Sequence, residues 1–351
     1  MDARGSGWRR RAAVLFSSGL LVLGTGARAA GVVPEAAGPP AGAAGVAGVP
    51  LEVATIGGVP RLVATVVIGG ARLRVLVDTG STGLRVVAGK IPRTAVTVLG
   101  DAAPYGYGSG TRLHGKRATA DVMLGGFTAR KAPVHLVTST TCAARKPNCP
   151  AAGGRKPVMF GRALDGILGV STADAVGLAN PLWYLHNARH QPVGRQYAIH
   201  YDPEGQSRLL LGVPATGYRT VALPDKGDAD DPSGPPSWDS RQMHACFASP
   251  DLTGGKVCGP TLLDTGTPGL RILDPGSTAG PVPDDVDIDL SVPTAGWKRT
   301  LTTGDDTHAR VHGTQPSLAG LIAYVGTNVR YDLTSGTIGF APFPVATTGT
   351  P

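Results

Sequence analysis

Long helical patterns are scarce in this sequence. Its 351 residues instead include 51 glycines and 30 prolines, which favour short strands joined by turns. A chain of this length can form one large domain or two lobes, each with a sizeable core. We therefore expect a β-rich protein.

Clustered positive charge is also missing. The formal net charge is +8, but residues 1–29 hold five arginines and one aspartate and so account for half of it. The other basic residues form no run and are not interleaved with aromatic residues. These absences argue against a nucleic-acid-binding protein.

After the N-terminus, no apolar run is long enough to span a membrane. Residues 1–29 themselves have the pattern of a secretory signal peptide, with a positive segment at 9–11, an apolar segment at 12–24 and small residues at 27–29. The neighbouring arginines also allow a twin-arginine signal. We expect a secreted or periplasmic protein, with residues 30–50 as an Ala/Gly/Pro-rich linker.

Cysteine is present only four times, and no C-x-x-C motif occurs. The spacing favours two local disulfides, Cys142 with Cys149 and Cys246 with Cys258, and disulfides fit an exported protein. A metal site is the alternative interpretation, but it requires closer ligand partners. We expect disulfides and no metal.

Two common catalytic motifs are absent as well. There is no H-E-x-x-H, and His308 and His312, four residues apart in a polar segment, are expected on the surface. There is no G-x-S-x-G, which disfavours a serine hydrolase of the nucleophile-elbow type.

What the sequence does contain is one motif written twice. Residues 75–85 read VLVDTGSTGLR and residues 262–271 read LLDTGTPGLR, which places Asp78 and Asp264 186 positions apart. Each copy can lie in its own half of a two-lobed body. Two equivalent carboxylates brought together in this way allow one to act as a base while the other acts as an acid.

Other segments add local expectations. Residues 63–68 and 73–77 predict a hairpin that leads into Asp78, with a Gly-Gly turn between them. Residues 105–111 predict a flexible hairpin tip. Residues 172–190 are the one plausible helix of the first half, either continuous or broken at Pro181. We expect the boundary between the halves near residues 195–202.

Taken together, these residues resemble the pepsin-like aspartic proteases, over roughly residues 60–342, as an exported bacterial member of that family. The matching segments follow the family's order: the two active-site turns (78–81 and 264–267), a flap with its tyrosine (107–111), strands behind the aspartates (165–169 and 318–320), a small disulfide loop (Cys246 and Cys258) and the closing strands (Asp332 and 338–342).

The resemblance implies a mostly β, bilobal fold with two β-barrel-like lobes and a central cleft. It divides the chain into a signal peptide (1–29), a linker (30–50), a first lobe (51–198), a second lobe (199–345) and a loose tail (346–351). It implies no metal, no organic cofactor and a monomer.

The resemblance also assigns roles. Asp78 and Asp264 would share one proton and activate a water between them. The supporting residues would be the glycines and hydroxyls of the two turns: Gly80 and Gly266 for backbone N–H bonds, Ser81 and Thr267 for hydroxyl bonds, Thr79 and Thr265 for cross-links between the turns. Tyr107 and Gly108 would form the flap over the substrate.

Several points stay open. Tyr105 lies two residues from Tyr107 and could be the flap tyrosine instead. Ser81 and Thr267 could be simple turn formers. Arg85 stands where the family commonly has a tryptophan that supports the flap; it and its counterpart Arg271 could orient the flap, shape subsites or lie on the surface.

The function we expect is an aspartic endopeptidase that cleaves a polypeptide substrate and works best below neutral pH. The alternative is a catalytically weak or inactive peptide-binding module of the cell envelope. A structural envelope protein is a third possibility.

Overall fold

The computed structural model describes residues 46–152, 157, 159–175, 177–227, 234–304, 308–312 and 316–343. These residues belong to one unit, Pro39–Pro351. The expected signal peptide, most of the expected linker and the expected tail lie outside the described residues. Within the described part, no helix has the length and apolar character needed to cross a membrane.

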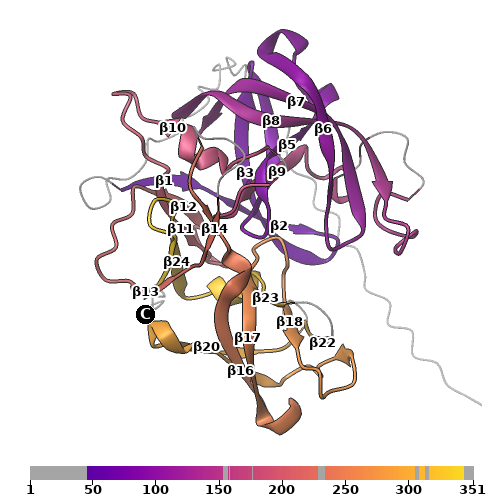
Figure 1. The fold of residues 1–351 in the computed structure, drawn as a ribbon, viewed down its shortest axis with the longest axis vertical. Coiled ribbons are helices and arrows are strands. Elements are labelled where there is room, and N and C mark those ends of the chain that lie inside the picture. The colour runs from indigo at the N-terminus through magenta and orange to yellow at the C-terminus, as the bar shows by residue number, and fades with distance from the viewer. Residues whose placement is uncertain are drawn as a thin grey trace, which may run out of the picture. The chain divides into compact units, whose positions relative to one another are not determined.

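The described chain is built from strands and short 3-10 helices, which confirms the expectation of a mostly β fold (Figure 1). A nine-stranded sheet carries the first Asp-Thr-Gly. Its order is β10-β8-β5-β9-β4-β3-β7-β6, with β2 paired to β3. The bounds are β2 (Glu52–Ile56), β3 (Val59–Ile68), β4 (Ala71–Asp78), β5 (Thr82–Val87), β6 (Val96–Gly106), β7 (Thr111–Leu124), β8 (Phe127–Cys142), β9 (Gly166–Val170) and β10 (Leu185–His186).

An eight-stranded sheet carries the second Asp-Thr-Gly, in the order β19-β22-β18-β23-β17-β16-β20-β21. Its bounds are β16 (Met243–Ala248), β17 (Lys256–Leu263), β18 (Leu270–Leu273), β19 (Gly280–Pro281), β20 (Asp287–Val292), β21 (Trp297–Thr302), β22 (Ala309–His312) and β23 (Ser317–Ala319).

A six-stranded sheet combines strands from the two ends and the middle of the described chain, in the order β1-β12-β11-β24-β25-β13. Its bounds are β1 (Ala47–Pro50), β11 (Gln196–His200), β12 (Arg208–Leu211), β13 (Arg219–Ala222), β24 (Thr327–Asp332) and β25 (Thr337–Pro342). A small ribbon pairs β14 (Asp225–Gly227) with β15 (Ser237–Trp238). The 3-10 helices are η1 (Ala88–Lys90), η2 (Arg93–Ala95), η3 (Phe160–Arg162), η4 (Pro181–Tyr184), η5 (Ser240–Gln242), η6 (Thr253–Gly255), η7 (Pro293–Ala295) and η8 (Leu321–Tyr324).

The hairpin before Asp78 forms as predicted. Strands β3 and β4 pair antiparallel, and the turn between them uses Gly69 and Gly70 at φ of 55° and 81°, which favours glycine. Alternate residues of both strands, such as Val66 and Val75, are fully buried. Close to Asp78 both faces of β4 are buried, because Val75 and Val77 pack in one core cluster and Leu76 packs in another.

Two local predictions are wrong. Residues 47–50 were expected to end a linker, but they form β1 and pair with β12, with Val49 buried. The Gly/Pro-rich composition concealed this strand. Because β1 lies at the edge of its sheet, Pro50 is tolerated there.

The expected helix at 172–190 is also wrong. The described residues of this range contain only η4 and β10 as regular elements. Gly177 adopts a φ of 72° and Pro181 lacks an N–H, so neither suits a helix interior. Asn180 instead accepts the Leu182 N–H and starts the single turn η4.

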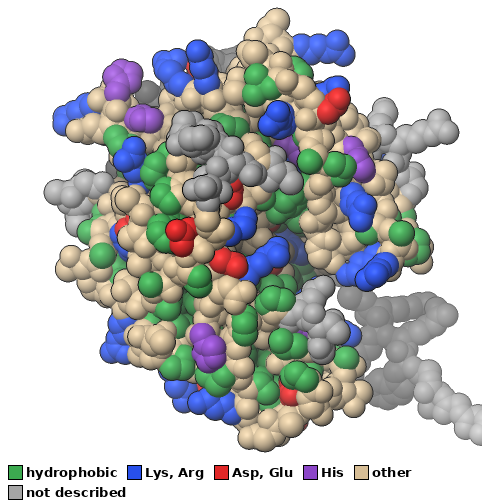
Figure 2. Space-filling view, in the orientation of Figure 1, with side chains coloured by type: hydrophobic (Ala, Val, Ile, Leu, Met, Phe, Trp, Pro, Cys, Tyr) green, Lys and Arg blue, Asp and Glu red, His purple; other side chains and the backbone are tan. Residues whose placement is uncertain are grey.

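The surface carries its charge in scattered positions. On the face drawn in Figure 2, Lys and Arg side chains lie among other residue types and do not gather in one patch. This agrees with the absence of basic runs in the sequence.

Candidate active site

Each Asp-Thr-Gly lies where one strand ends and the next begins. In the first half, β4 ends at Asp78 and β5 starts at Thr82. Strand β9 lies between them, parallel to β4 and antiparallel to β5, with Gly169 opposite both Asp78 and Gly83. A Cβ at Gly169 would lie 2.8 Å from the Ser81 carbonyl, so only glycine lets the turn approach this strand.

The second half repeats this arrangement. Strands β17 and β18 flank β23, which is parallel to the first and antiparallel to the second. A Cβ at Gly320 would lie 2.1 Å from the Gly269 carbonyl oxygen. The segments 165–169 and 318–320 thus lie behind the two aspartates, where the sequence predicted them.

Hydrogen bonds between Thr79 and Thr265 join the two turns directly. The Thr79 N–H donates to Thr265 Oγ1 at 3.1 Å, and the Thr265 N–H donates to Thr79 Oγ1 at 3.0 Å. Each hydroxyl then donates to a carbonyl of the opposite half, Leu263 for Thr79 at 2.9 Å and Val77 for Thr265 at 2.8 Å. These four buried bonds fix the distance between the turns.

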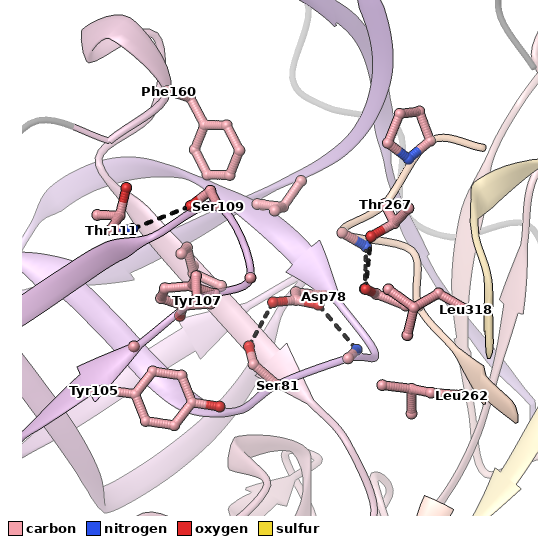
Figure 3. Close-up of a pocket in the computed structure, with 18 of the residues that line it drawn as sticks. Asp78, Ser81, Tyr105, Tyr107, Ser109, Thr111, Phe160, Leu262, Thr267 and Leu318 are labelled. Atoms are coloured by element: carbon pink, nitrogen blue, oxygen red, sulfur yellow. Dashed lines mark hydrogen bonds between the residues drawn. The ribbon is translucent and has the colours of Figure 1, made fainter. Parts of the chain in front are cut away.

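The backbone holds both carboxylates in matching ways. The Gly80 N–H donates to Asp78 Oδ1 and the Gly266 N–H donates to Asp264 Oδ1, each at 2.9 Å. The two carboxylates are therefore held in equivalent ways by their turns, and Figure 3 draws the bond to Asp78.

Hydroxyl groups complete this match. Ser81 Oγ donates to Asp78 Oδ2 at 2.5 Å, and Thr267 Oγ1 donates to Asp264 Oδ2 at 2.8 Å. Ser81 and Thr267 therefore do more than form turns, because each holds the outer oxygen of its neighbouring carboxylate.

The two carboxyl groups lie close together. A Cβ at Gly80 would lie 2.4 Å from Asp264 Oδ1, and one at Gly266 would lie 2.7 Å from Asp78 Oδ1. Asp78 is only 4% exposed. Burial first, and the charge of Asp264 second, raise the pKa of Asp78 to about 7.

The residues predicted to form the flap lie at the tip of the β6–β7 hairpin. Its tip closes through two backbone bonds of 2.9 Å, from Tyr107 N to the Thr111 carbonyl and from Gly110 N to the Tyr107 carbonyl. Lys146 donates to the Gly108 carbonyl at 2.6 Å. The tip is thus attached to the segment that follows β8.

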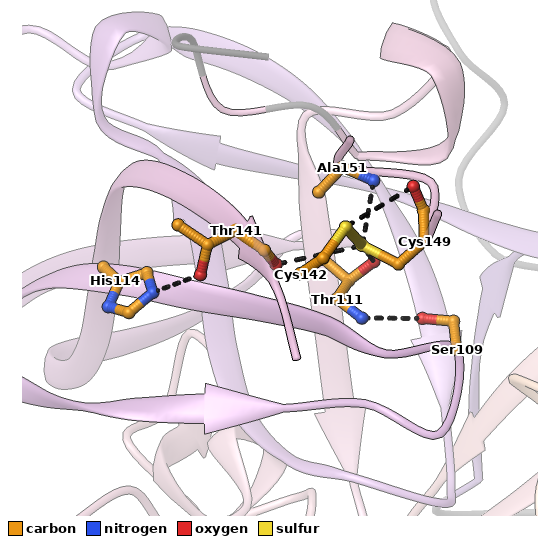
Figure 4. The surroundings of a disulfide bond; sticks show 7 residues. All are labelled: Ser109, Thr111, His114, Thr141, Cys142, Cys149 and Ala151. Atoms are coloured by element: carbon orange, nitrogen blue, oxygen red, sulfur yellow. Dashed lines mark hydrogen bonds between the residues drawn. A yellow bond between two sulfur atoms is a disulfide. The ribbon is translucent and has the colours of Figure 1, made fainter. Parts of the chain in front are cut away.

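The Cys142–Cys149 disulfide lies beside this tip (Figure 4). Thr111 Oγ1 contacts Cys149 Sγ at 3.7 Å, and the Ala143 N–H donates to the Gly110 carbonyl at 2.7 Å. The disulfide loop therefore braces the base of the flap tip.

The second disulfide links Cys246 of β16 to Cys258 of β17, which are paired across the hairpin. Both disulfide predictions are therefore confirmed. None of these cysteines is free to bind a metal.

Both candidate flap tyrosines face the cleft. Tyr105 and Tyr107 pack edge to face, with ring centroids 5.1 Å apart. Tyr107 lies next to Ser81 and Asp78, and burial raises its pKa. Tyr105 contacts a different partner, because its ring lies 3.6 Å from the Arg85 guanidinium.

Arg85 and Arg271 lie in different surroundings. Arg85 is fully buried, stacks on Tyr105 and donates to the Thr82 and Gly83 carbonyls. The surface interpretation is therefore wrong for Arg85. Arg271 is exposed and lines the cleft.

The sequence analysis missed a buried tyrosine cluster. Tyr324 contacts Thr79 Oγ1 at 3.0 Å and the Tyr331 hydroxyl at 2.6 Å, and Tyr331 stacks on Tyr197 with centroids 5.1 Å apart. These residues connect the threonine cross-link to the six-stranded sheet. Their separation in the sequence gave no local signal.

Arg61 was missed as well. It comes from β3, donates to the Gly266 carbonyl and lies 5.5 Å from the Phe160 ring centroid. Burial lowers the pKa of Arg61, while the charges of Asp264 and Asp78 oppose this effect. A cation therefore lies beside the aspartate pair.

The cleft around the pair has a volume of about 630 Å³. One part of its lining is apolar and comes from the first half, including Leu76, Met159, Phe160 and Ile167. Leu262 and Leu318 line it from the second half (Figure 3). Apolar walls next to a hydrogen-bonded carboxylate pair are typical of a binding site for an organic ligand or peptide.

One of three comparisons with known proteins bears on the fold. Residues 73–177 match a family described as "Protein of unknown function (DUF3443)". No curated protein matched the sequence. Among solved structures, the chain is similar to the crystal structure of aspartic proteinase from Irpex lacteus, with 15% identity, a TM-score of 0.55, and coverage of 87% of this chain and 100% of that one. This similarity shows that the chain has the bilobal fold of a pepsin-like aspartic proteinase.

Proposed function

We propose that this protein is an aspartic endopeptidase in which Asp78 and Asp264 hydrolyse peptide bonds through a water held between them. The observation that carries this proposal is the matched pair of carboxylates, each bonded by a glycine N–H and a hydroxyl of its own turn. The fold similarity to an aspartic proteinase supports it.

The chemistry follows from the shared proton. Two carboxyl groups in contact cannot both ionise at low cost, so the pair retains one proton where an isolated carboxyl would lose it. The raised pKa of Asp78, about 7, fits this state. The ionised carboxylate takes a proton from water, and the protonated one donates to the peptide carbonyl oxygen.

The tip of the β6–β7 hairpin also has a role in the proposed reaction. We assign to Tyr107 and Gly108 the closure of the cleft over a bound peptide, because this tip lies next to the aspartate pair and its disulfide brace. Tyr105 supports the hairpin from below through Arg85. Two disulfides fit a secreted or periplasmic location.

A peptide-binding module without turnover is the second candidate. Arg61 favours it, because a cation beside the pair makes ionisation of both carboxyl groups easier and so opposes the shared proton that hydrolysis needs. The two candidates differ in what Asp264 contributes. In the module, Asp264→Asn would leave peptide affinity nearly unchanged, and the native protein would have no cleavage to lose.

The test is cleavage of a reduced, denatured protein substrate between pH 3 and 9. We expect Asp78→Asn and Asp264→Asn each to lower kcat by about 10²–10⁴-fold, the usual contribution of a general acid or base. Because the proton is lost as pH rises through the raised pKa of Asp78, the native rate should fall above about pH 7. Asp251→Asn, in an exposed turn, is the matched control. Equal rates in all four proteins would refute the peptidase.

A further inference from the structure

The charged residues that line the cleft are the aspartate pair and three arginines, Arg61, Arg241 and Arg271. If the pair carries a single negative charge, the lining has an excess of positive charge. In the described part of the chain, none of the three arginines forms an ion pair with a carboxylate. The cleft therefore holds guanidinium groups whose charge nothing in the described protein balances except the pair itself.

The three arginines do not have the same position. Arg61 is half-buried and already engaged, by the Gly266 carbonyl and the Phe160 ring. It is part of the structure that surrounds the aspartate pair. Arg241 and Arg271 are exposed within the cleft lining, so their guanidinium groups remain free to meet a ligand.

Arg241 and Arg271 come from different elements around the pair. Arg241 belongs to η5, and its charge acts on Tyr105 at the base of the flap. Arg271 belongs to β18, where it is paired with Leu318 of β23. A peptide in the cleft would therefore meet an arginine at two separate points, with the apolar walls beside them.

We propose that the cleft selects polypeptide segments that carry Asp or Glu side chains close to the bond presented to Asp78 and Asp264, and that Arg241 and Arg271 bind those side chains. This inference rests on the proposed function, since it names the substrate class of the same site. A guanidinium group binds a carboxylate through two parallel hydrogen bonds. A partly enclosed cleft strengthens this attraction relative to open water.

The preference would act at more than one stage. The excess positive charge draws acidic segments toward the cleft and speeds their association at low salt. Once the segment is bound, the arginine–carboxylate pairs fix its register relative to the aspartate pair. A basic side chain at the same place would be repelled and would leave the guanidinium groups unpaired.

The test begins with a digest of a peptide library, whose products identify the cleaved bonds by mass spectrometry. Three matched fluorogenic peptides are then made around the best bond, with Glu, Gln or Lys at the position nearest the arginines. We expect kcat/KM for the Glu peptide to exceed that for the Gln peptide by about tenfold, which is the size of one charge-assisted hydrogen bond. The Lys peptide should be the poorest, and added salt should reduce the difference.

Variants then locate the effect. Arg271→Gln and Arg241→Gln should each move the Glu-to-Gln ratio toward one. Arg310→Gln is the matched control, because Arg310 is an exposed arginine opposite Arg271 on β22 and does not line the cleft. A ratio that stays high in both cleft variants would overturn the assignment of these arginines.

The outcomes separate this inference from the proposed function. Equal cleavage of the Glu and Gln peptides would overturn the acidic preference and leave the peptidase standing. If the library gives no cleavage product, the peptidase fails, and fluorescence anisotropy on the full protein decides the inference, with three labelled peptides of one apolar sequence that carry Glu, Gln or Lys at one central position. Tighter binding of the Glu peptide than of the Gln peptide would support it, and equal binding would overturn it.

Discussion

The two Asp-Thr-Gly halves have the same arrangement of strands and hydrogen bonds around the aspartate, which we call the shared frame. The residues around this frame differ between the halves. In each half, a strand enters the turn, a second leaves it, and a third lies between them behind the aspartate. The hydrogen bonds to Asp78 and Asp264 match one for one. What the two halves share is thus the part that sets the geometry of the carboxylate pair.

The halves differ in what covers the frame. The first half carries the β6–β7 hairpin, and Arg85 is fully buried beneath its Tyr105. In the second half, Arg271 follows the same Gly-Leu but remains exposed in the cleft. The same motif position thus packs against the β6–β7 hairpin in one half and lines the cleft in the other. The repeated motif positions the two aspartates. The β6–β7 hairpin lies over them on one side, and the exposed Arg271 lies on the other.

Among changes that leave both aspartates in place, the largest effect is expected at the glycines of the two turns. In Gly80→Ala, the new Cβ would lie 2.4 Å from Asp264 Oδ1, and in Gly266→Ala it would lie 2.7 Å from Asp78 Oδ1. Neither glycine has a positive φ, so the methyl group acts by crowding alone. We expect kcat/KM to fall by about 100-fold, because displacements near 1 Å cost that much.

Gly89→Ala is the control for these two glycine variants, because its Cβ would meet no atom within 4 Å. Gly80→Ala should lose more activity than Gly266→Ala, since its contact is closer. The kcat/KM of all three variants is measured with one peptide substrate. Full activity in Gly80→Ala would mean that the separation of the carboxylates does not limit the reaction.

A smaller effect, on stability, is expected from the threonine cross-link. Valine keeps the shape of threonine but leaves a buried N–H and a carbonyl without partners, which costs about 1–3 kcal/mol. Thr79→Val should cost more than Thr265→Val, because the Thr79 hydroxyl also contacts Tyr324. Urea unfolding measures the difference, with the exposed Thr138→Val as the control. Equal costs would show that the tyrosine contact adds nothing.

How far the sequence predicts this site depends on the distance between partners. The duplicated turns, the hairpin before Asp78 and both disulfides were predictable, because each is a short repeated or local pattern. Arg61 was not, since its partner Gly266 is 205 positions away. The contact between Thr79 and Tyr324 spans 245 positions. Such contacts exist only once the sheets have assembled.

The same reason explains the errors. Residues 172–190 have a helix-compatible pattern, yet tertiary packing and the two backbone breakers Gly177 and Pro181 gave one turn. The composition of residues 47–50 suggested a linker, yet these residues pair with β12 as the edge strand of its sheet. Pairing with a distant strand decided the second case, and two helix-breaking residues decided the first.

The smallest effect is expected at Arg85, where the halves differ most. Its Nε and one terminal nitrogen lack hydrogen-bond partners in the described structure, and the charge is fully buried. Replacing a buried charge with an apolar side chain of similar size is often neutral or stabilising. We therefore expect Arg85→Met to raise the free energy of unfolding by about 1 kcal/mol. It should also loosen the β6–β7 hairpin, because Tyr105 loses the cation on its ring face.

His135 gives this change a direct reporter. It is paired with Arg85 on the neighbouring strand β8, and burial first and Arg85 second lower its pKa to about 4. Removing the guanidinium should raise that pKa, which a titration followed by NMR measures. Hydrogen exchange in β6 and β7 should become faster in Arg85→Met and stay unchanged in Arg271→Met. Equal exchange in both variants would mean that the β6–β7 hairpin does not depend on the buried arginine. The two halves would then differ only in that the first half has this hairpin, and the burial of Arg85 would have no role.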